Sequence, residues 1–477
     1  MKIRFGLVLT LAMGSSLTAC AGGASSGGSS PAPAISGSGG QMLQQGERPR
    51  QTEETRTAQR ALEQAERTEG EAEVQAFYEQ ALTAATAAIA TDSTNPLPHL
   101  QAGTAALGLG RYEVADGFLT RAEQLRPIYS IETEGMRERA WINIYQEAAP
   151  LVSAGDHEGA AVIFEHANAI YDRRPEVMIT LGQIYATLRR HDEAIANLDR
   201  AAAIIADPER LAEMDSATVA SWKEQGAEIP MTKASVLADA GRFEEAVAIF
   251  QQLVQEHPEN IVFRRNLGAV LIQTGDTTRA FQVYEDLMGQ PGLSSQDFYA
   301  IGVGYYQGED YVRAARAFQG ASNLAKKDRD AIEMWARSLQ IDSLYAEVPA
   351  AAERWIELDP NNQNAYLILA QAVNHEGDGA RAGRLVEQIE ALTVAVNDLQ
   401  LMRRDDGARV TGSVLNKSLA AGAQVTLNFT FYDAAGNSVG TQAVTVTVGA
   451  KDTAEIFDLM FTSTAKVDGY GYAPVGG

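Results

Sequence analysis

Residues 261–292 read IVFRRNLGAVLIQTGDTTRAFQVYEDLMGQPG, and this stretch decides the fold because its pattern recurs along the chain. Apolar residues follow helical spacing up to Leu271, turn formers interrupt them at 274–276, and a second apolar run starts at Ala280. The stretch therefore predicts a helix, a tight turn and a second helix. Pro291 falls where the second helix has to end, because proline has no N–H to continue the hydrogen-bond ladder.

Copies of this unit recur at a constant interval, which we call the repeat step. It equals the separation in sequence between Gly268 and Gly302. Both glycines stand in the first helix of their copy, each after an apolar residue. The position of Ala280 in the second helix is taken in the other copies by Ala246, Ala314, Val348 and Ala382. A repeat of about 34 residues predicts two-helix units that stack into a solenoid, each burying its apolar face against its neighbours.

Less regular copies come earlier in the chain, at 54–91, 97–127, 141–174 and 175–207. The interval between copies exceeds the repeat step at two places, where the segments 130–139 and 208–226 are inserted. Both insertions have the apolar spacing of helices. We therefore expect them to lengthen existing helices or to add one.

The order of residues within a copy resembles that of the tetratricopeptide repeat (TPR) family. Leucine and glycine stand in the first helix with an aromatic residue a few positions on, and glycine, alanine, an aromatic residue and a closing proline follow. The resemblance implies a mainly α fold, with a TPR-type α-solenoid of about eight helix pairs over residues 56–393. It also implies that the first helices of successive units line a concave groove for segments of partner proteins.

Helical phasing points six side chains towards that groove. Tyrosine and arginine carry much of the binding energy in protein interfaces, which favours such positions as partner contacts. The predicted partner-binding residues are Arg265, Asn266, Tyr299, Tyr306, Arg337 and Asn374. Some TPR proteins grip a partner's C-terminal carboxylate with a fixed set of lysines and asparagines. Ala269 and Asp330 stand at two of those positions here, so we do not expect that mode.

The first 20 residues have the pattern of a targeting segment. Lys2 and Arg4 precede an apolar core at 5–13 that is too short to span a bilayer. Leu-Thr-Ala-Cys at 17–20 then resembles the lipobox of bacterial lipoproteins, which implies a lipid (palmitate) anchor on Cys20, the only cysteine in the chain. In this family an aspartate after the cysteine retains the protein in the inner membrane of enteric bacteria. Since alanine follows here, we expect the outer membrane, facing the periplasm. The Gly/Ser/Pro-rich segment 21–55 is expected to be a disordered tether.

The repeat pattern stops near residue 393, and residues 394–477 predict a small antiparallel β-sandwich. Segments rich in valine, threonine and phenylalanine, separated by turn formers, lie at 409–414, 424–432, 439–448 and 452–461. Val410, Phe429 and Phe457 with their neighbours resemble the FxLYD-type immunoglobulin-like domains of bacterial envelope proteins. Further on, Tyr470 and Tyr472 are candidates for a carbohydrate contact, although the glycines beside them favour a loose tail.

Composition argues against several functions. The formal net charge of −23 disfavours nucleic acid and anionic bilayer surfaces as electrostatic partners. His157 and His375 each precede a glutamate, as in zinc-protease helices, but Ala161 and Gly379 stand where the second histidine would have to be. We therefore predict no metal, no cofactor and no enzymatic activity.

These patterns together predict a lipid-anchored periplasmic TPR scaffold or adaptor. It would bind protein or peptide partners in its groove, and the family resemblance implies a role in envelope assembly or secretion. One alternative is an enzyme, or an accessory subunit of an enzyme, that acts on cell-wall polymers. Another is a carbohydrate-binding module that acts through the sandwich.

Overall fold

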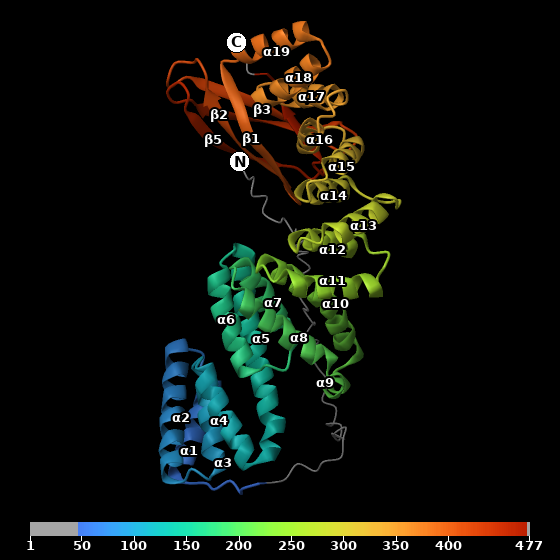
Figure 1. Cartoon of the computed structure of the whole chain (residues 1–477). Helices are drawn as coiled ribbons and strands as arrows, with labels where there is room; N and C mark the ends of the chain where they lie inside the picture. Colours follow the sequence, from blue (N-terminus) through green and yellow to red (C-terminus); the bar gives the residue numbers. More distant parts are fainter. Residues whose placement is uncertain (1–45, 475–477) are drawn as a thin grey trace. The chain divides into compact units, whose positions relative to one another are not determined.

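The computed structural model describes residues 46–474, which form two compact units divided after Ala246 (Figure 1). Three sequence predictions fall mostly or wholly outside the described residues. They are the targeting segment, the lipid anchor on Cys20 and most of the disordered tether. In the described part, no helix combines the length and the apolar character needed to cross a membrane.

Unit 1, described over residues 46–246, consists of helical hairpins with short connections. Its helices are α1 (Glu53–Arg67), α2 (Glu71–Thr91), α3 (Pro96–Gly108), α4 (Tyr112–Leu125), α5 (Ser130–Ala154), α6 (His157–Ile170), α7 (Pro175–Thr187), α8 (His191–Ala206), α9 (Pro208–Glu213) and α10 (Ser216–Asp239), with a 3-10 turn at Pro127–Tyr129. The two insertions act as expected, because the first lengthens α5 to 25 residues and the second supplies α9 and the start of α10.

Unit 2, described over residues 247–474, continues with helices and ends in strands. α11 (Phe243–Glu256) crosses the division between the units. It is followed by α12 (Ile261–Gln273), α13 (Thr277–Met288), α14 (Ser295–Gln307), α15 (Tyr311–Leu324), α16 (Arg329–Ile341), α17 (Val348–Leu358), α18 (Gln363–His375) and α19 (Gly379–Ala391). α12 packs on α14 and α16 packs on α18, so first helices of successive hairpins are neighbours.

A glycine in the first helix of a hairpin packs against a large residue of the second helix. The contact recurs in four hairpins with the large residue always 16 positions later: Gly103 with Leu119, Gly182 with Leu198, Gly268 with Tyr284, and Gly302 with Phe318. A Cβ at Gly302 would lie 2.8 Å from the Phe318 ring, so the glycine lets the two helices approach closely. This contact is the physical reason for the leucine-glycine pattern of the repeat.

Tyr284 is fully buried, and its hydroxyl group has no hydrogen-bond partner among the described residues. Because an unsatisfied buried hydroxyl costs stability, Tyr284→Phe is expected to raise the free energy of unfolding by about 1–2 kcal/mol. Thermal and urea unfolding of the full chain measure this. The control is Tyr305→Phe, because the Tyr305 hydroxyl has an acceptor, the Phe281 carbonyl oxygen at 3.5 Å. A Tyr284→Phe variant less stable than the parent would contradict the assignment.

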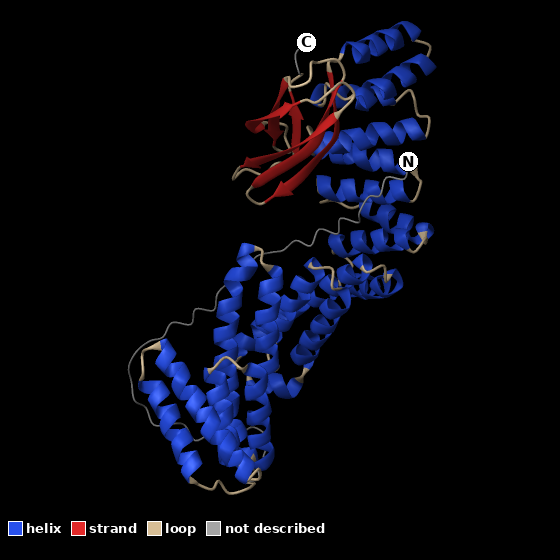
Figure 2. Cartoon of the chain, turned by 90° about the vertical axis from the view of Figure 1, so that its left-hand side faces the viewer, coloured by secondary structure: helices blue, strands red, loops and turns tan. Residues whose placement is uncertain are grey.

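The strands form two three-stranded antiparallel sheets that lie beside the helices of unit 2 (Figure 2). They are β1 (Val394–Arg404), β2 (Gly407–Asn416), β3 (Gln424–Tyr432), β4 (Ser438–Thr447), β5 (Ala454–Thr462) and β6 (Gly469–Tyr472). One sheet has the order β1-β2-β5 and the other β4-β3-β6. Alternate residues of facing strands, among them Val410, Phe429 and Phe457, fill the core between the sheets.

The four strands predicted from sequence correspond to β2, β3, β4 and β5, whereas β1 and β6 are additional. The prediction of a loose tail around Tyr470 and Tyr472 is wrong, because both residues belong to β6 and are 0% and 4% exposed. Each glycine of β6 lies against backbone, Gly469 against Lys327 and Gly471 against Leu358, so glycine serves close packing here. The same burial removes these tyrosines as candidates for a carbohydrate contact.

Candidate functional site

The candidate site is the stripe of side chains that the first helices of unit 2 share, here called the first-helix face. Its members occupy the same three positions of each helix, separated by the repeat step. They are Arg265, Ala269 and Gln273 on α12, Tyr299, Val303 and Gln307 on α14, Glu333, Arg337 and Ile341 on α16, and Leu367, Gln371 and His375 on α18. The other three predicted residues, Asn266, Tyr306 and Asn374, stand beside members of this stripe.

Both predicted arginines are held by carboxylates of the same chain. Arg265 Nη1 lies 2.6 Å from Asp297 Oδ1, and Arg337 Nε lies 2.6 Å from Glu333 Oε1. The Arg337 guanidinium also lies over the Trp355 ring, 5.3 Å from its centroid. The positive charges of this face are therefore compensated within the chain.

The two predicted tyrosines have different surroundings. Tyr299 is half-buried with its ring edge-on to Phe318, and burial together with the nearby Asp330 carboxylate raises the pKa of its hydroxyl. Tyr306 is half-buried and meets the Tyr311 ring edge-on at 5.2 Å.

The predicted asparagines bracket the face. Asn266 is half-buried on α12 beside Arg265, whereas Asn374 is exposed in the last turn of α18. Arg265 and Asn374 belong to the first and the last hairpin of this row, and the structure does not bring all six predicted residues into one cluster. They are spread along successive first helices.

Sequence reasoning missed a set of glutamines on and beside the first-helix face. Gln273 Nε2 donates to Gln307 Oε1 at 3.2 Å, so the amides join α12 to α14. In the same way Gln340 Nε2 donates to Gln371 Oε1 at 2.9 Å and joins α16 to α18. The separation of Gln273 and Gln307 by one repeat step could have pointed to them.

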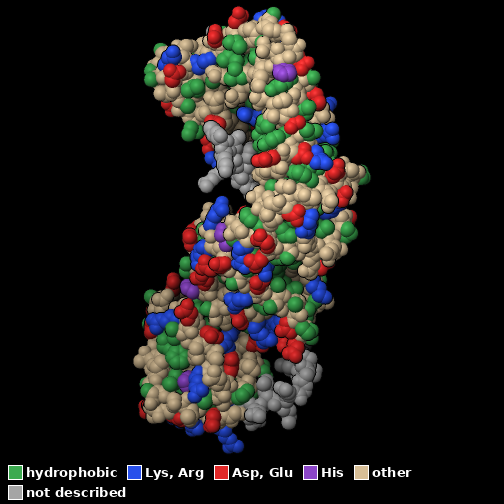
Figure 3. Space-filling model, in the orientation of Figure 1, with side chains coloured by type: hydrophobic (Ala, Val, Ile, Leu, Met, Phe, Trp, Pro, Cys, Tyr) green, Lys and Arg blue, Asp and Glu red, His purple; other side chains and the backbone are tan. Residues whose placement is uncertain are grey.

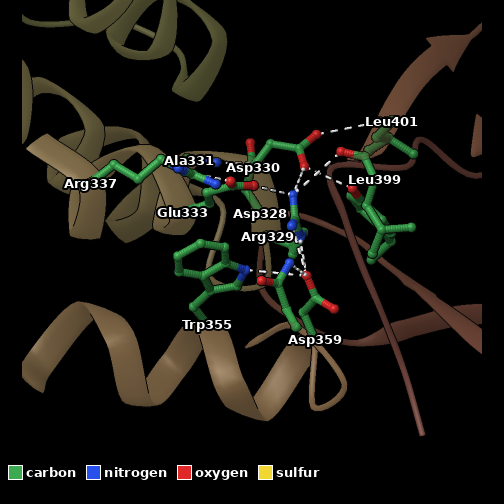
Figure 4. A network of polar contacts seen from close by, with 12 residues as sticks. Asp328, Arg329, Asp330, Ala331, Glu333, Arg337, Trp355, Asp359, Leu399 and Leu401 are labelled. Atoms are coloured by element: carbon green, nitrogen blue, oxygen red, sulfur yellow. Dashed lines mark hydrogen bonds and ion pairs between the residues drawn. The ribbon is translucent and has the colours of Figure 1, made fainter. Parts of the chain in front are cut away.

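A buried ionic network lies where the first-helix face begins on α16 (Figure 4). Its centre is Arg329, which is 2% exposed. The Arg329 guanidinium donates twice to Asp359 Oδ2, from Nε at 3.0 Å and from Nη2 at 2.7 Å. Its Nη1 lies 3.0 Å from Asp330 Oδ1 and 2.5 Å from Glu333 Oε2. Glu333 thus connects this network to Arg337 on the open part of the face.

The sandwich is attached to this network by side chains and by its backbone. The Tyr470 hydroxyl donates to Asp330 Oδ1 and the Tyr472 hydroxyl to Asp359 Oδ1, each at 2.7 Å. The Tyr470 N–H also donates to the Lys327 carbonyl oxygen at 3.0 Å. We call this contact between the sandwich and α16–α18 the junction.

A second ion pair closes the junction. Arg403 of β1 donates to Asp328 Oδ2 at 2.8 Å, and Asp328 also caps α16 by accepting from the Ala331 N–H at 3.1 Å. Burial raises the pKa of the Asp328 carboxyl group to about 6, although the Arg403 charge acts in the opposite direction. The junction is therefore polar, buried and almost fully hydrogen-bonded. Buried polar groups that are satisfied in this way favour a rigid contact.

Unit 1 offers two shallow depressions. One of about 450 Å³ is lined by Arg190, Arg242 and their neighbours, and one of about 430 Å³ lies around Tyr185. Two of its arginines are paired within the chain, Arg190 with Glu193 and Arg242 Nε with Glu245 Oε1 at 2.7 Å. Over residues 46–474, no group of three His, Cys, Asp or Glu side chains is placed to hold a metal ion.

Comparison with known proteins supports the repeat pattern. The tetratricopeptide repeat family model matches residues 151–214 and 237–291. No curated protein sequence matches the chain. Similar solved structures include the C-terminal part of a TPR repeat-containing protein from Cytophaga hutchinsonii, with 17% identity, a TM-score of 0.41 and coverage of 52% of this chain and 95% of that chain.

Two further solved structures are similar at comparable identity. A tetratricopeptide repeat protein from Parabacteroides merdae has 15% identity, a TM-score of 0.30 and coverage of 60% of this chain and 99% of that one. YrrB, described as a TPR protein with an unusual peptide-binding site, has 16% identity, a TM-score of 0.31 and coverage of 36% and 89%. The family match identifies residues 151–214 and 237–291 as tetratricopeptide repeats, and helical hairpins continue on both sides of these stretches.

Proposed function

We propose that the chain is a scaffold that binds a protein or peptide partner on the first-helix face of unit 2. The observation that carries this proposal is the exposure of apolar side chains among the polar ones of that face. Ile341 is 45% exposed on α16 and Leu367 is 49% exposed on α18, with Gln371 and Asn374 beside them. Apolar side chains surrounded by amides form a surface of the kind that protein partners cover.

The test compares two variants in a pull-down from detergent-solubilised envelopes, with the full chain as bait. Leu367→Arg places a long charged side chain on the first-helix face at an exposed position. Val386→Arg is the matched control, because Val386 is also exposed but lies on α19, the second helix of the same hairpin. We expect a partner that the parent and Val386→Arg retain and that Leu367→Arg loses. Identical sets of retained proteins for both variants would contradict the proposal.

The proposal includes a lipid anchor on Cys20, which is supported by the sequence at 17–20 alone. Cys20→Ala is expected to move the full chain from the membrane fraction to the soluble fraction and to abolish labelling with radioactive palmitate. Density separation of the envelope then checks the proposed outer-membrane location. Labelling of Cys20→Ala at the parental level would contradict the anchor.

Within this proposal, the anchored chain raises the local concentration of its partner at the membrane, as tethering does in general. Envelope assembly or secretion is the process in which we place it. The antiparallel sandwich supports the resemblance of residues 394–477 to FxLYD-type immunoglobulin-like domains. We propose that the sandwich is a fixed part of unit 2, attached to its helices at the junction.

A further inference from the structure

The two sheets of the sandwich have four edges, of which β1, β6 and β5 are protected. β1 lies against the helices, where the Val396 N–H donates to the Asn361 carbonyl oxygen at 3.0 Å, and β6 lies against them at the junction. β5 carries the charged residues Glu455 and Asp458. Natural proteins protect strand edges in these ways, because an exposed edge offers unpaired N–H and C=O groups to another chain.

The remaining edge, β4, has none of these protections. β4 is the end strand of the β4-β3-β6 sheet, and its sequence SVGTQAVTVT contains no charged residue and no proline. A register shift at its start, opposite Phe431 and Tyr432, leaves residues 441–447 regular. β3 is uncharged as well. An uncharged strand pair is unusual in this chain, since Figure 3 shows acidic and basic side chains scattered over the drawn face of the protein.

Charged residues lie beyond the ends of β4. They are Asp433, Lys326 and Lys327 near the turn before it, and Lys451, Asp452 and Glu455 near the loop after it. The regular part of the strand is therefore an uncharged stretch between charged ends.

Alternate residues of β4 direct their main-chain N–H and C=O groups to the open side. In an antiparallel ladder, successive residues direct these groups to opposite sides of the strand. The Asn428 carbonyl oxygen of β3 accepts from the Ala473 N–H at 3.2 Å, on the side of β6. Asn428 stands opposite Ala443, so Ala443 directs its own groups away from β3. The residues that do so, here called the edge row, are Thr441, Ala443, Thr445 and Thr447.

The side chains of the edge row are exposed on the outer face of the sheet. They already pair with polar side chains of β3, since the hydroxyl groups of Thr426 and Thr445 are hydrogen-bonded at 2.9 Å. Gln442 is exposed too, although it stands opposite the buried Phe429 on the inner side, so β5 leaves this edge open. Both the main chain and the side chains of the edge row are therefore accessible to another strand.

We propose that β4 pairs antiparallel with β4 of a second copy of this chain, so that two three-stranded sheets become one continuous sheet. The register that uses the whole edge row centres on Val444. Thr441 then stands opposite Thr447 of the second copy, and Ala443 stands opposite its Thr445. About eight main-chain hydrogen bonds form in this register. The two half-buried Val444 side chains meet on the inner side of the sheet and cover each other.

A second copy is the occupant that the charges favour. Two chains with a net charge of −23 repel each other, so contact between copies is least opposed where both lack charge. β4 is also complementary to itself, because a two-fold axis brings the same surface of both copies together and sets threonine opposite threonine. The inference goes beyond the proposed function and does not depend on it, since it concerns a different surface of the chain.

The test is sedimentation equilibrium of the purified full chain in density-matched detergent, at protein concentrations up to about 100 μM. The edge variant carries Ala443→Lys and Thr445→Lys, which sets lysine opposite lysine in the proposed register. The matched control carries Asn428→Lys and Thr426→Lys, which adds the same charge at exposed positions of β3 directly opposite those two residues. We expect the parent and the control to dimerise, and the dissociation constant of the edge variant to be at least about tenfold higher.

Cross-linking locates the two-fold axis. In Val444→Cys the two cysteines form a non-hydrogen-bonded pair with Cα atoms about 4.5 Å apart, which a disulfide can bridge. In the control, Thr426→Cys, the cysteines lie one strand further from the axis on each side and are at least about 14 Å apart. Mild oxidation should link most of the Val444→Cys chains into dimers and leave Thr426→Cys at the parental level.

Two kinds of result would overturn the inference. One is a parent chain that stays monomeric up to about 100 μM, whether its edge is open or covered by another segment or another protein. The other is equal behaviour of a variant and its control, either equal association of the two lysine variants or equal cross-linking of Val444→Cys and Thr426→Cys.

Discussion

Replacing Asp359 by alanine is expected to lower the free energy of unfolding of unit 2 by about 3–5 kcal/mol, because the change leaves buried charge and buried donors without a partner. Asp359 is 0% exposed, and its carboxylate accepts from five donors. They are the Arg329 Nε and Nη2, the Trp355 Nε1 at 3.2 Å, the Asn362 Nδ2 at 2.8 Å and the Tyr472 hydroxyl at 2.7 Å. Arg329 keeps Asp330 and Glu333, so the substitution weakens the network without removing every counter-charge.

The matched control is Asp458→Ala. Asp458 also forms a two-point ion pair with an arginine, since Arg409 Nε donates to its Oδ1 at 2.8 Å and Nη2 to its other oxygen. Both side chains are exposed on the outer face of the β1-β2-β5 sheet, where solvent screens the pair. We expect Asp458→Ala to unfold at nearly the parental urea concentration. An equal loss of unfolding free energy in the two variants would contradict the expectation that burial makes the Asp359 contacts more stabilising than those of Asp458.

The hairpins could be predicted from sequence because their cause is local and periodic. Gly268 meets Tyr284 and Gly302 meets Phe318 in the same way, so the packing of one hairpin is repeated in the next and appears in the sequence as the repeat step. The middle strands were predictable for a similar reason. In β3, apolar residues alternate with polar ones, which is the pattern of a half-buried strand.

β1 and β6 were missed because their causes are not local. The register of β1 shifts between Asn397 and Gln400, so the alternation of apolar residues changes face within the strand. β6 has only four residues, and its tyrosines reach Asp330 and Asp359, which are more than 100 positions away in sequence. One sequence does not show such pairings.

The site residues divide in the same way. Residue type and helical phase were enough to place Arg337 on a first helix, and its pairing with Glu333 at a spacing of four residues could have been read too. The pairing of Arg265 with Asp297 spans neighbouring hairpins and needed the structure. Because of this pairing, the charge of Arg265 is already compensated within the chain.

Gly469→Ala is expected to detach β6 from the helices and to lower the free energy of unfolding by about 3 kcal/mol or more. A Cβ at Gly469 would overlap the Lys327 carbonyl oxygen, and it would lie 2.8 Å from the Asp328 backbone nitrogen. These are backbone atoms, so no side-chain rotation relieves the overlap. The strand has no room to retreat, since the Asp468 N–H beside it donates to the Tyr432 carbonyl oxygen at 2.8 Å.

Detachment of β6 would break three contacts of the junction together. They are the hydrogen bond from the Tyr470 N–H to Lys327 and the two tyrosine hydroxyl contacts with Asp330 and Asp359. Hydrogen exchange separates this effect from general unfolding, because the Tyr470 amide should exchange faster while amides in the middle of α12 keep their protection.

Gly383→Ala is the control for the same substitution. Gly383 lies in α19, and an added Cβ there would have no neighbour within 4 Å. Since alanine favours a helix over glycine, this variant should be as stable as the parent or more stable by up to about 1 kcal/mol. Parental stability and parental exchange of Tyr470 in Gly469→Ala would mean that β6 does not lie against the loop before α16. The sandwich would then be free of the first-helix face, and the part of that face now taken by the junction would be open to a partner.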